Sequence, residues 1–108
     1  MIDAGKYPAA HAQVAARIVD GAAVIVLADS GLVQVLDEIG TRVWELMDGS
    51  RTVAQVVQAI ENEYEVSLEQ ATRDVVELTQ NLLDAQAIVL KDAPAGTGEG
   101  LPPRGDAR

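Results

Sequence analysis

A chain of 108 residues has room for one domain rather than two, and its 48% hydrophobic content is enough for a core. It has no cysteine and one histidine, His11, which excludes disulfides, thiolate zinc sites and a histidine metal cage. The formal charge is −9, and residues 1–90 carry all of it. Because acidic surfaces repel phosphate backbones, nucleic acid is not an expected partner.

The longest uninterrupted apolar stretch is Ala22–Ala28, far short of the roughly 18 residues that a membrane helix needs. No secretion-signal pattern opens the sequence. We therefore expect a soluble cytoplasmic protein without a membrane partner.

Residues 1–11 show no clear periodicity, and we expect a flexible lead-in there. Asp20-Gly21 then forms a strong hairpin signal, since both residues tolerate a positive φ, and residues 29–31 form a second turn signal. The runs around these turns are apolar and rich in β-branched residues. They predict a three-stranded antiparallel meander with strands over residues 12–19, 23–28 and 32–36.

From residue 37 the apolar spacing becomes helical, which predicts three helices and an α+β fold. The first helix is expected to end at Asp48-Gly49, with Gly in the usual terminating position, and the second within the acidic residues 61–65. The third should run to Ala85, and its start matches a capping box through Gln70. The three helices are each preceded by a residue that caps helix N-termini: Asp37, Thr52 and Ser67.

The third helix has an apolar stripe at alternating spacings of three and four, which predicts burial of Leu68, Ala71, Val75, Leu78, Leu82 and Ala85. A second line flanks this stripe and consists of Thr72, Val76, Thr79 and Leu83. Either the domain covers this second line, or the line forms one wall of a groove.

The apolar residues 88–90 predict a last strand or extended segment, which closes a domain over residues 12–91. Beyond it, residues 92–108 are rich in Pro and Gly. Such a segment cannot bury enough surface to offset its ordering entropy, so we expect a disordered tail.

The sequence lacks the residues that catalysis or cofactor binding would need. It has no Gly-rich phosphate loop, no His-Glu zinc motif and no Ser in a nucleophile elbow. The alternating carboxylates Glu61, Glu63 and Glu65 lack the EF-hand ligand order and its Gly. We expect a binding protein that is not an enzyme and holds neither cofactor nor metal.

The segment Leu36–Gly49, LDEIGTRVWELMDG, is followed by Thr52–Val57 and then by Tyr64 with Val66. The order of these motifs, with Asp20-Gly21 upstream, resembles the sequence pattern of the PqqD family, which is named for pyrroloquinoline quinone biosynthesis protein D. The resemblance covers about two-thirds of the chain. Two features depart from the family pattern. Asp37 stands where Asn is usual, and the strand over residues 32–36 lacks the aromatic residues often found there.

The resemblance implies a RiPP recognition element, a domain that serves ribosomally synthesised and post-translationally modified peptides. Such a domain has three strands and three helices in a winged-helix-like arrangement. It takes the leader segment of a precursor peptide as an added strand along the third strand, with the third helix on the peptide's other side. The partner is then a modifying enzyme, either a radical S-adenosylmethionine protein or a leader peptidase.

On this basis the expected peptide-binding residues of the third strand are Leu32, Val33, Gln34, Val35 and Leu36, the last mainly a core residue. Those expected on the third helix are Arg73, Val76, Gln80 and Leu83. Val76 and Leu83 also fit a second core layer, and Arg73 also fits a surface pair with Glu69 or Glu77.

Two other functions remain open from the sequence. A winged-helix DNA-binding regulator has a similar fold, although the net charge opposes it. An accessory subunit that contacts only the enzyme would need the same exposed apolar groove as a peptide-binding protein.

Overall fold

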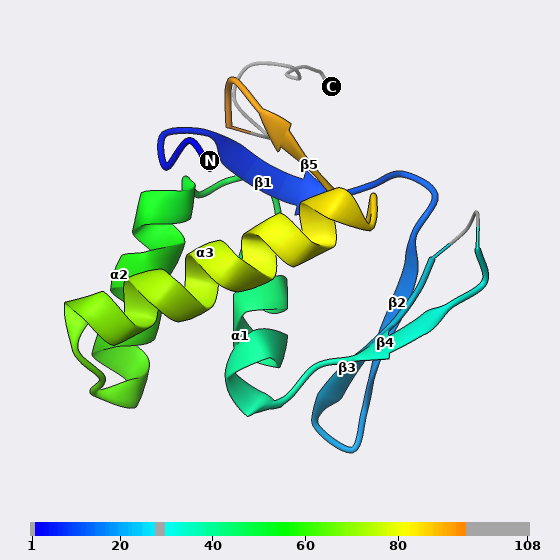
Figure 1. The fold of residues 1–108 in the computed structure, drawn as a ribbon, viewed down its shortest axis with the longest axis horizontal. Helices are drawn as coiled ribbons and strands as arrows, with labels where there is room; N and C mark the ends of the chain where they lie inside the picture. Colours follow the sequence, from blue (N-terminus) through cyan, green and yellow to red (C-terminus); the bar gives the residue numbers. More distant parts are fainter. Residues whose placement is uncertain (1, 28–29, 95–108) are drawn as a thin grey trace, which may run out of the picture.

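The computed structural model describes residues 2–27 and 30–94. Within these residues the chain forms two small antiparallel sheets and three helices (Figure 1). In chain order the elements are β1 (Tyr7–Ala10), β2 (Ala15–Val19), β3 (Ala22–Val26), β4 (Val33–Val35), α1 (Glu38–Leu46), α2 (Val53–Tyr64), α3 (Leu68–Asp84) and β5 (Ile88–Lys91). The α+β class predicted from the sequence is confirmed, with one additional two-stranded sheet.

The predicted meander is the sheet β2-β3-β4, with β3 in the centre. Asp20 and Gly21 have φ values of 52° and 83°, so the turn between β2 and β3 uses two left-handed residues as a tight hairpin requires. The strands are shorter than predicted, since β2 begins at Ala15 and β4 spans only Val33–Val35. Residues 28 and 29, predicted as a strand end and turn, lie outside the described residues.

All three helices begin at the predicted caps, where Asp37, Thr52 and Ser67 accept hydrogen bonds from backbone N–H groups. The reciprocal capping box, however, belongs to α2, where the Gln55 side chain also accepts from the Thr52 N–H. In α3 the Gln70 amide turns away and donates to Asp74 instead. The end of α1 also differs, because the helix stops at Leu46 and Gly49 lies beyond its cap.

The second sheet corrects the prediction of a flexible lead-in over residues 1–11. Tyr7–Ala10 forms β1, which pairs with β5 over its whole length, and Pro8 and Ala9 are buried. The Gly49 N–H donates to the Pro8 carbonyl at 2.9 Å, which ties β1 to the end of α1. The sequence did not show this strand because its partner lies about 80 residues away and its own pattern is weak.

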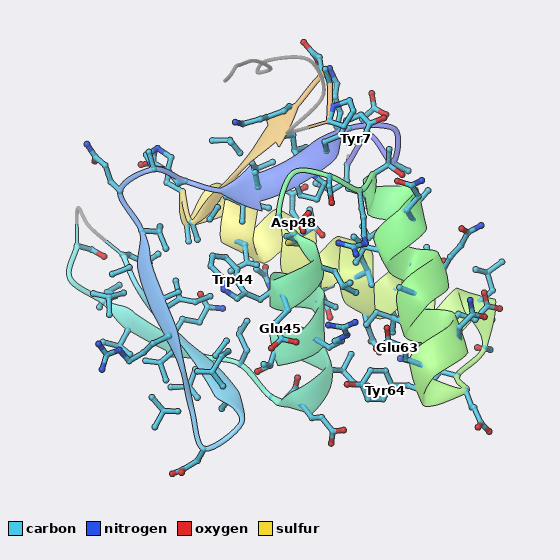
Figure 2. The ribbon with its side chains drawn as sticks, turned by 180° about the vertical axis from the view of Figure 1, so that it is seen from behind. Tyr7, Trp44, Glu45, Asp48, Glu63 and Tyr64 are labelled. Carbon is cyan, nitrogen blue, oxygen red and sulfur yellow. The ribbon has the colours of Figure 1, made fainter. Side chains whose placement is uncertain are left out.

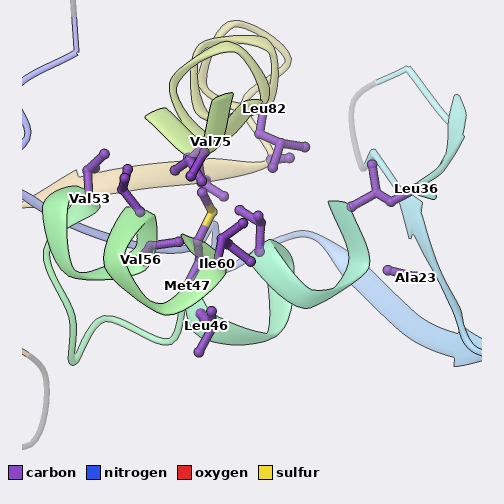
Figure 3. Packing of buried hydrophobic residues seen from close by; sticks show 14 of the residues in the cluster. Ala23, Leu36, Leu46, Met47, Val53, Val56, Ile60, Val75 and Leu82 are labelled. Atoms are coloured by element: carbon purple, nitrogen blue, oxygen red, sulfur yellow. The ribbon is translucent and has the colours of Figure 1, made fainter. Parts of the chain in front are cut away.

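One core joins the meander to the helices. Figure 3 shows Ala23 and Leu36 at the sheet end of this core, with Val53 and Val56 of α2 at the other end. Its buried members are Ala23, Ile25, Leu36, Val43, Leu46, Met47, Val53, Val56, Val57, Ile60, Ala71, Val75, Leu82, Ala87 and Ile88. The core therefore fixes β3 and the end of β4 against the helices, and α3 lies across α1 and α2 to one side of this sheet (Figure 1).

An ion pair on the surface adds a link between α1 and α2. The Arg42 guanidinium donates to both oxygens of Glu63, at 2.8 and 3.0 Å. The hydrogen bond from Arg42 lowers the pKa of Glu63 below its ordinary value. Both side chains are more than a third exposed, so the pair contributes little to stability.

Candidate functional site

Strand β4 is an edge strand with backbone groups directed away from its neighbour. The Leu36 N–H donates to the Ala23 carbonyl and the Leu27 N–H donates to the Leu32 carbonyl, both at 2.9 Å. In an antiparallel pair, residues alternate between facing the partner strand and facing away from it. Leu32, Gln34 and Leu36 therefore face β3, and Val33 and Val35 alternate with them. The N–H and C=O groups of Val33 and Val35 point to the open edge of the sheet.

The side chains of β4 alternate between the two faces of the sheet. Leu36 is buried and Gln34 half-buried on the face that packs against the helices. Val33 and Val35 are 59% and 63% exposed on the opposite face, beside Val26 and Val24 of β3. A strand added at this edge would therefore alternate between the helix side and the outer face.

A groove with a volume of about 410 Å³ lies between the end of β4, the start of α1 and α3. Its lining residues are Val35, Leu36, Asp37, Ile39, Gly40, Val43, Asp74, Glu77, Leu78 and Asn81. At its base a Cβ on Gly40 would lie 3.3 Å from the Leu36 Cβ and 3.5 Å from the Leu78 Cδ2. Residue 40 therefore allows a close approach that a larger side chain would obstruct.

The groove combines an apolar base with carboxylates. Asp37 accepts from the Gly40 N–H at 2.8 Å as the cap of α1, and Asp74 accepts from the Gln70 side chain at 2.9 Å. Glu77 lies one turn along α3 from Asp74 on the same side. No Lys or Arg is among the lining residues. An apolar segment with a positive charge would fit these walls.

Four of the nine predicted site residues lie on a different side of α3. Arg73, Val76, Gln80 and Leu83 do not line the groove. A helix turns by about 100° per residue, so the mean direction of these four side chains differs by more than roughly 100° from that of the groove-lining residues of α3. The two sets flank opposite sides of the buried stripe. Arg73 pairs with Glu69 at 3.6 Å, Gln80 donates to Asp84 at 2.8 Å, and Leu83 packs against the core.

Some residues of the two apolar lines predicted on α3 lie in a different environment from the one predicted. Thr79, from the flanking line, is fully buried and donates to the Val75 carbonyl at 2.6 Å. Leu68, from the predicted stripe, is 54% exposed. Leu78, from the same stripe, lines the groove. The signal that could have identified the groove wall was the polar set Asp74, Glu77 and Asn81 with Leu78, at spacings of three and four on one helix face.

The opposite edge of the sheet, β2, is also open and has its own hollow. This hollow has a volume of about 380 Å³ and is lined by Ala10, Ala16, Arg17, Ile18, Trp44, Glu45, Met47 and Asp48. Figure 2 shows the Trp44 ring on the side of α1 toward β2. Trp44 also packs against the core, as predicted. The sheet β2-β3-β4 thus has two open edges, β2 and β4, each beside a hollow.

The described residues contain no group of three His, Cys, Asp or Glu side chains that could hold a metal ion. Within the same residues, no helix is long and apolar enough to cross a membrane. On α3, Arg73 is the one basic residue against four acidic ones, so this helix does not form the basic surface that DNA recognition needs.

A family model described as coenzyme PQQ synthesis protein D matches residues 22–88, from the start of β3 to the start of β5. The chain belongs to the PqqD family. The match includes β4, α1 and α3, and therefore every residue that lines the groove. The resemblance noted in the sequence is thereby confirmed. Curated proteins give no match.

Two solved structures are similar to this PqqD-family chain. One is "TbiB1 in Complex with the TbiA(beta) Leader Peptide", with a TM-score of 0.68, 24% identity and coverage of 74% of this chain and 93% of that one. The other is "Lasso peptide synthetase B1 complexed with the leader peptide", with a TM-score of 0.67, 24% identity and coverage of 77% and 98%. At this level of identity the likeness shows a shared fold.

Proposed function

We propose that this PqqD-family chain is a RiPP recognition element, which binds the leader segment of a ribosomally synthesised precursor peptide and presents it to a modifying enzyme. The observation that carries the proposal is the open edge of β4 directly beside the groove against α3. The two similar solved structures support it, because both are complexes with a leader peptide.

In the proposed complex the leader adds a fourth strand to the sheet β2-β3-β4. The N–H and C=O groups of Val33 and Val35 bond to the peptide backbone and supply affinity that does not depend on the peptide's side chains. Alternate peptide side chains, opposite Gln34 and Leu36, enter the groove and supply specificity. This replaces the predicted helix residues with Asp74, Glu77, Leu78 and Asn81.

The same proposal assigns no reaction to this chain. Its groove offers carboxylates and apolar side chains but no nucleophile paired with a base, which supports a binding role. The chemistry then belongs to the partner, a radical S-adenosylmethionine enzyme or a leader peptidase. We place the complex in the cytoplasm, where ribosomes make the precursor.

The experiment is an NMR titration of the full ¹⁵N-labelled chain with leader peptides of precursors encoded beside it. We expect saturable shifts at residues 32–37 and 74–81, and slower hydrogen exchange of the Val33 and Val35 amides. Absence of a saturable shift with every such leader would contradict the proposal. If the partner enzyme still bound, the chain would be an accessory subunit that contacts the enzyme alone.

A further inference from the structure

We infer that the peptide bound at β4 carries a lysine or arginine on its groove-facing side, held by Asp74 and Glu77 of α3. This inference rests on the proposed function and names the chemical class of its ligand. Three features of the groove carry it: the direction of the side chains on an added strand, the charges on the groove wall, and the apolar base below them.

The first feature is direction. Paired residues on neighbouring strands share a face of the sheet, so peptide residues opposite Gln34 and Leu36 point to the same side as those side chains. That side is the helix side, since Leu36 is buried in the core. Two peptide side chains, two positions apart, therefore point to the helix side, where Leu36 lines the groove. Their neighbours lie beside the exposed Val33 and Val35.

The second feature is charge. Among the described residues, no ion pair joins Asp74 or Glu77 to a Lys or Arg. The cations that pair elsewhere are Lys6 with Asp92, Arg42 with Glu45 and Glu63, Arg51 with Asp48, and Arg73 with Glu69. Arg73 adjoins Asp74 in sequence but pairs with Glu69 instead. Within residues 2–27 and 30–94, the negative charge of the groove wall is therefore not neutralised by an ion pair.

The third feature decides what kind of cation fits. No group of three potential metal ligands exists among the described residues, so this pair of carboxylates does not form a metal site. Leu36, Ile39 and Leu78 make the base of the groove apolar. Lys and Arg can lay their methylene stems on such a base while the charged end reaches the carboxylates. A long basic side chain satisfies both requirements at once.

The test measures affinity of the full chain, by calorimetry or fluorescence anisotropy, for the leader of the precursor encoded beside it. Variants of that leader carry Gln or Glu at each basic position in turn. We expect one position at which Gln weakens binding about fivefold and Glu about tenfold or more at low salt, with a smaller effect at high salt.

A charge exchange identifies the partner of that position. Glu77→Lys should weaken binding of the natural leader by about tenfold and restore binding of the leader with Glu at the basic position. Glu69→Lys makes the same charge change on the far side of α3 and should alter neither affinity by more than about twofold. NMR spectra of both variants check that the fold is intact.

The outcomes separate this inference from the proposed function. A leader that binds the β4 edge, yet has no basic residue whose charge matters, overturns the inference and leaves the function standing. A leader that responds equally to Glu77→Lys and Glu69→Lys also overturns it, because the effect is then one of net charge. Absence of leader binding overturns both.

Discussion

The two edges of the meander sheet differ in how they are protected. Strand β2 carries Arg17 at its centre, whereas β4 reads Val-Gln-Val and has no charge. A charged residue on an edge strand discourages pairing with another chain. Each edge lies beside a hollow of similar volume, about 380 Å³ at β2 and about 410 Å³ at β4.

The neighbouring helix makes the second difference. At β2 the hollow lies against α1 and the Trp44 ring, while at β4 the groove lies against a wall of α3 with Asp74 and Glu77. An open edge with a hollow beside it therefore does not by itself distinguish β4 from β2. The combination of an unprotected edge with a chemically distinct wall distinguishes β4, and each prediction below tests that distinction.

The largest effect is expected for Val35→Pro. Proline removes the outward N–H of Val35 and places a ring on the path of an added strand, yet it takes no bond from β3. Leader affinity should fall at least about thirtyfold, or about 2 kcal/mol. The matched control is Ile18→Pro on β2, whose N–H also points outward by the same alternation. Equal losses in both variants would contradict the assignment to β4.

The second-largest effect is expected for Gly40→Val, and it is an effect on stability. An added Cβ already lies 3.0 Å from the Asp37 Oδ1 and close to Leu36, so the branches of valine must displace the start of α1. The free energy of unfolding should fall by about 2 kcal/mol, measured by urea denaturation. Gly40→Ala should cost far less, because the helix propensity of alanine offsets part of the contact. If the valine variant were as stable as the unmodified chain, the base of the groove would have room for a larger side chain at residue 40, which contradicts the account.

Trp44→Leu tests the opposite edge. It removes aromatic contacts with the core and opens the hollow beside β2, so stability should fall by about 1 kcal/mol. Leader affinity should stay within about twofold of the unmodified chain, measured at a temperature where both proteins are folded. A loss as large as that of Val35→Pro would place the peptide at β2 instead.

The smallest effect concerns the pair of Arg42 and Glu63 between α1 and α2, neither of which lines the hollow at either edge. The pKa of Glu63 is lowered in the folded chain. The stabilisation that the ionised Glu63 contributes is therefore present at neutral pH and is lost as the pH falls through that lowered pKa. Glu63→Gln should remove it, at about 0.5 kcal/mol because the pair is exposed, and should flatten that part of the acid unfolding curve. Leader affinity should not change. A stability loss well above 1 kcal/mol would show a larger role for Arg42.

Local signals predicted much of the fold. The Asp20-Gly21 turn and the caps at Asp37, Thr52 and Ser67 act within a few residues, so they could be read directly from the sequence. The pairing of β1 with β5 joins residues at opposite ends of the chain, and no local pattern encodes it. Residues 95–108, predicted as most of a disordered tail, lie outside the described residues.

The proposed site keeps the strand predicted from the sequence and uses a different face of α3. The strand over residues 32–36 was predicted as the edge, and Val33 and Val35 are the residues that face outward. On α3 the sequence predicts a wall of Arg73, Val76, Gln80 and Leu83, beside the main apolar stripe. Thr79 instead packs inside the domain, and the polar flank with Asp74 and Glu77 faces β4. Which flank of α3 lies toward the end of β4 depends on how the helix packs on α1 and α2, which periodicity does not encode.

The most direct test of the account is a set of intermolecular NOEs between the labelled chain and an unlabelled leader peptide. An added strand predicts contacts from the peptide backbone to the amide and α protons of residues 33–35, in a regular ladder, and from peptide side chains to Leu36 and Leu78. A ladder along Ala16 and Ile18 of β2, or contacts to side chains without any ladder, would contradict it.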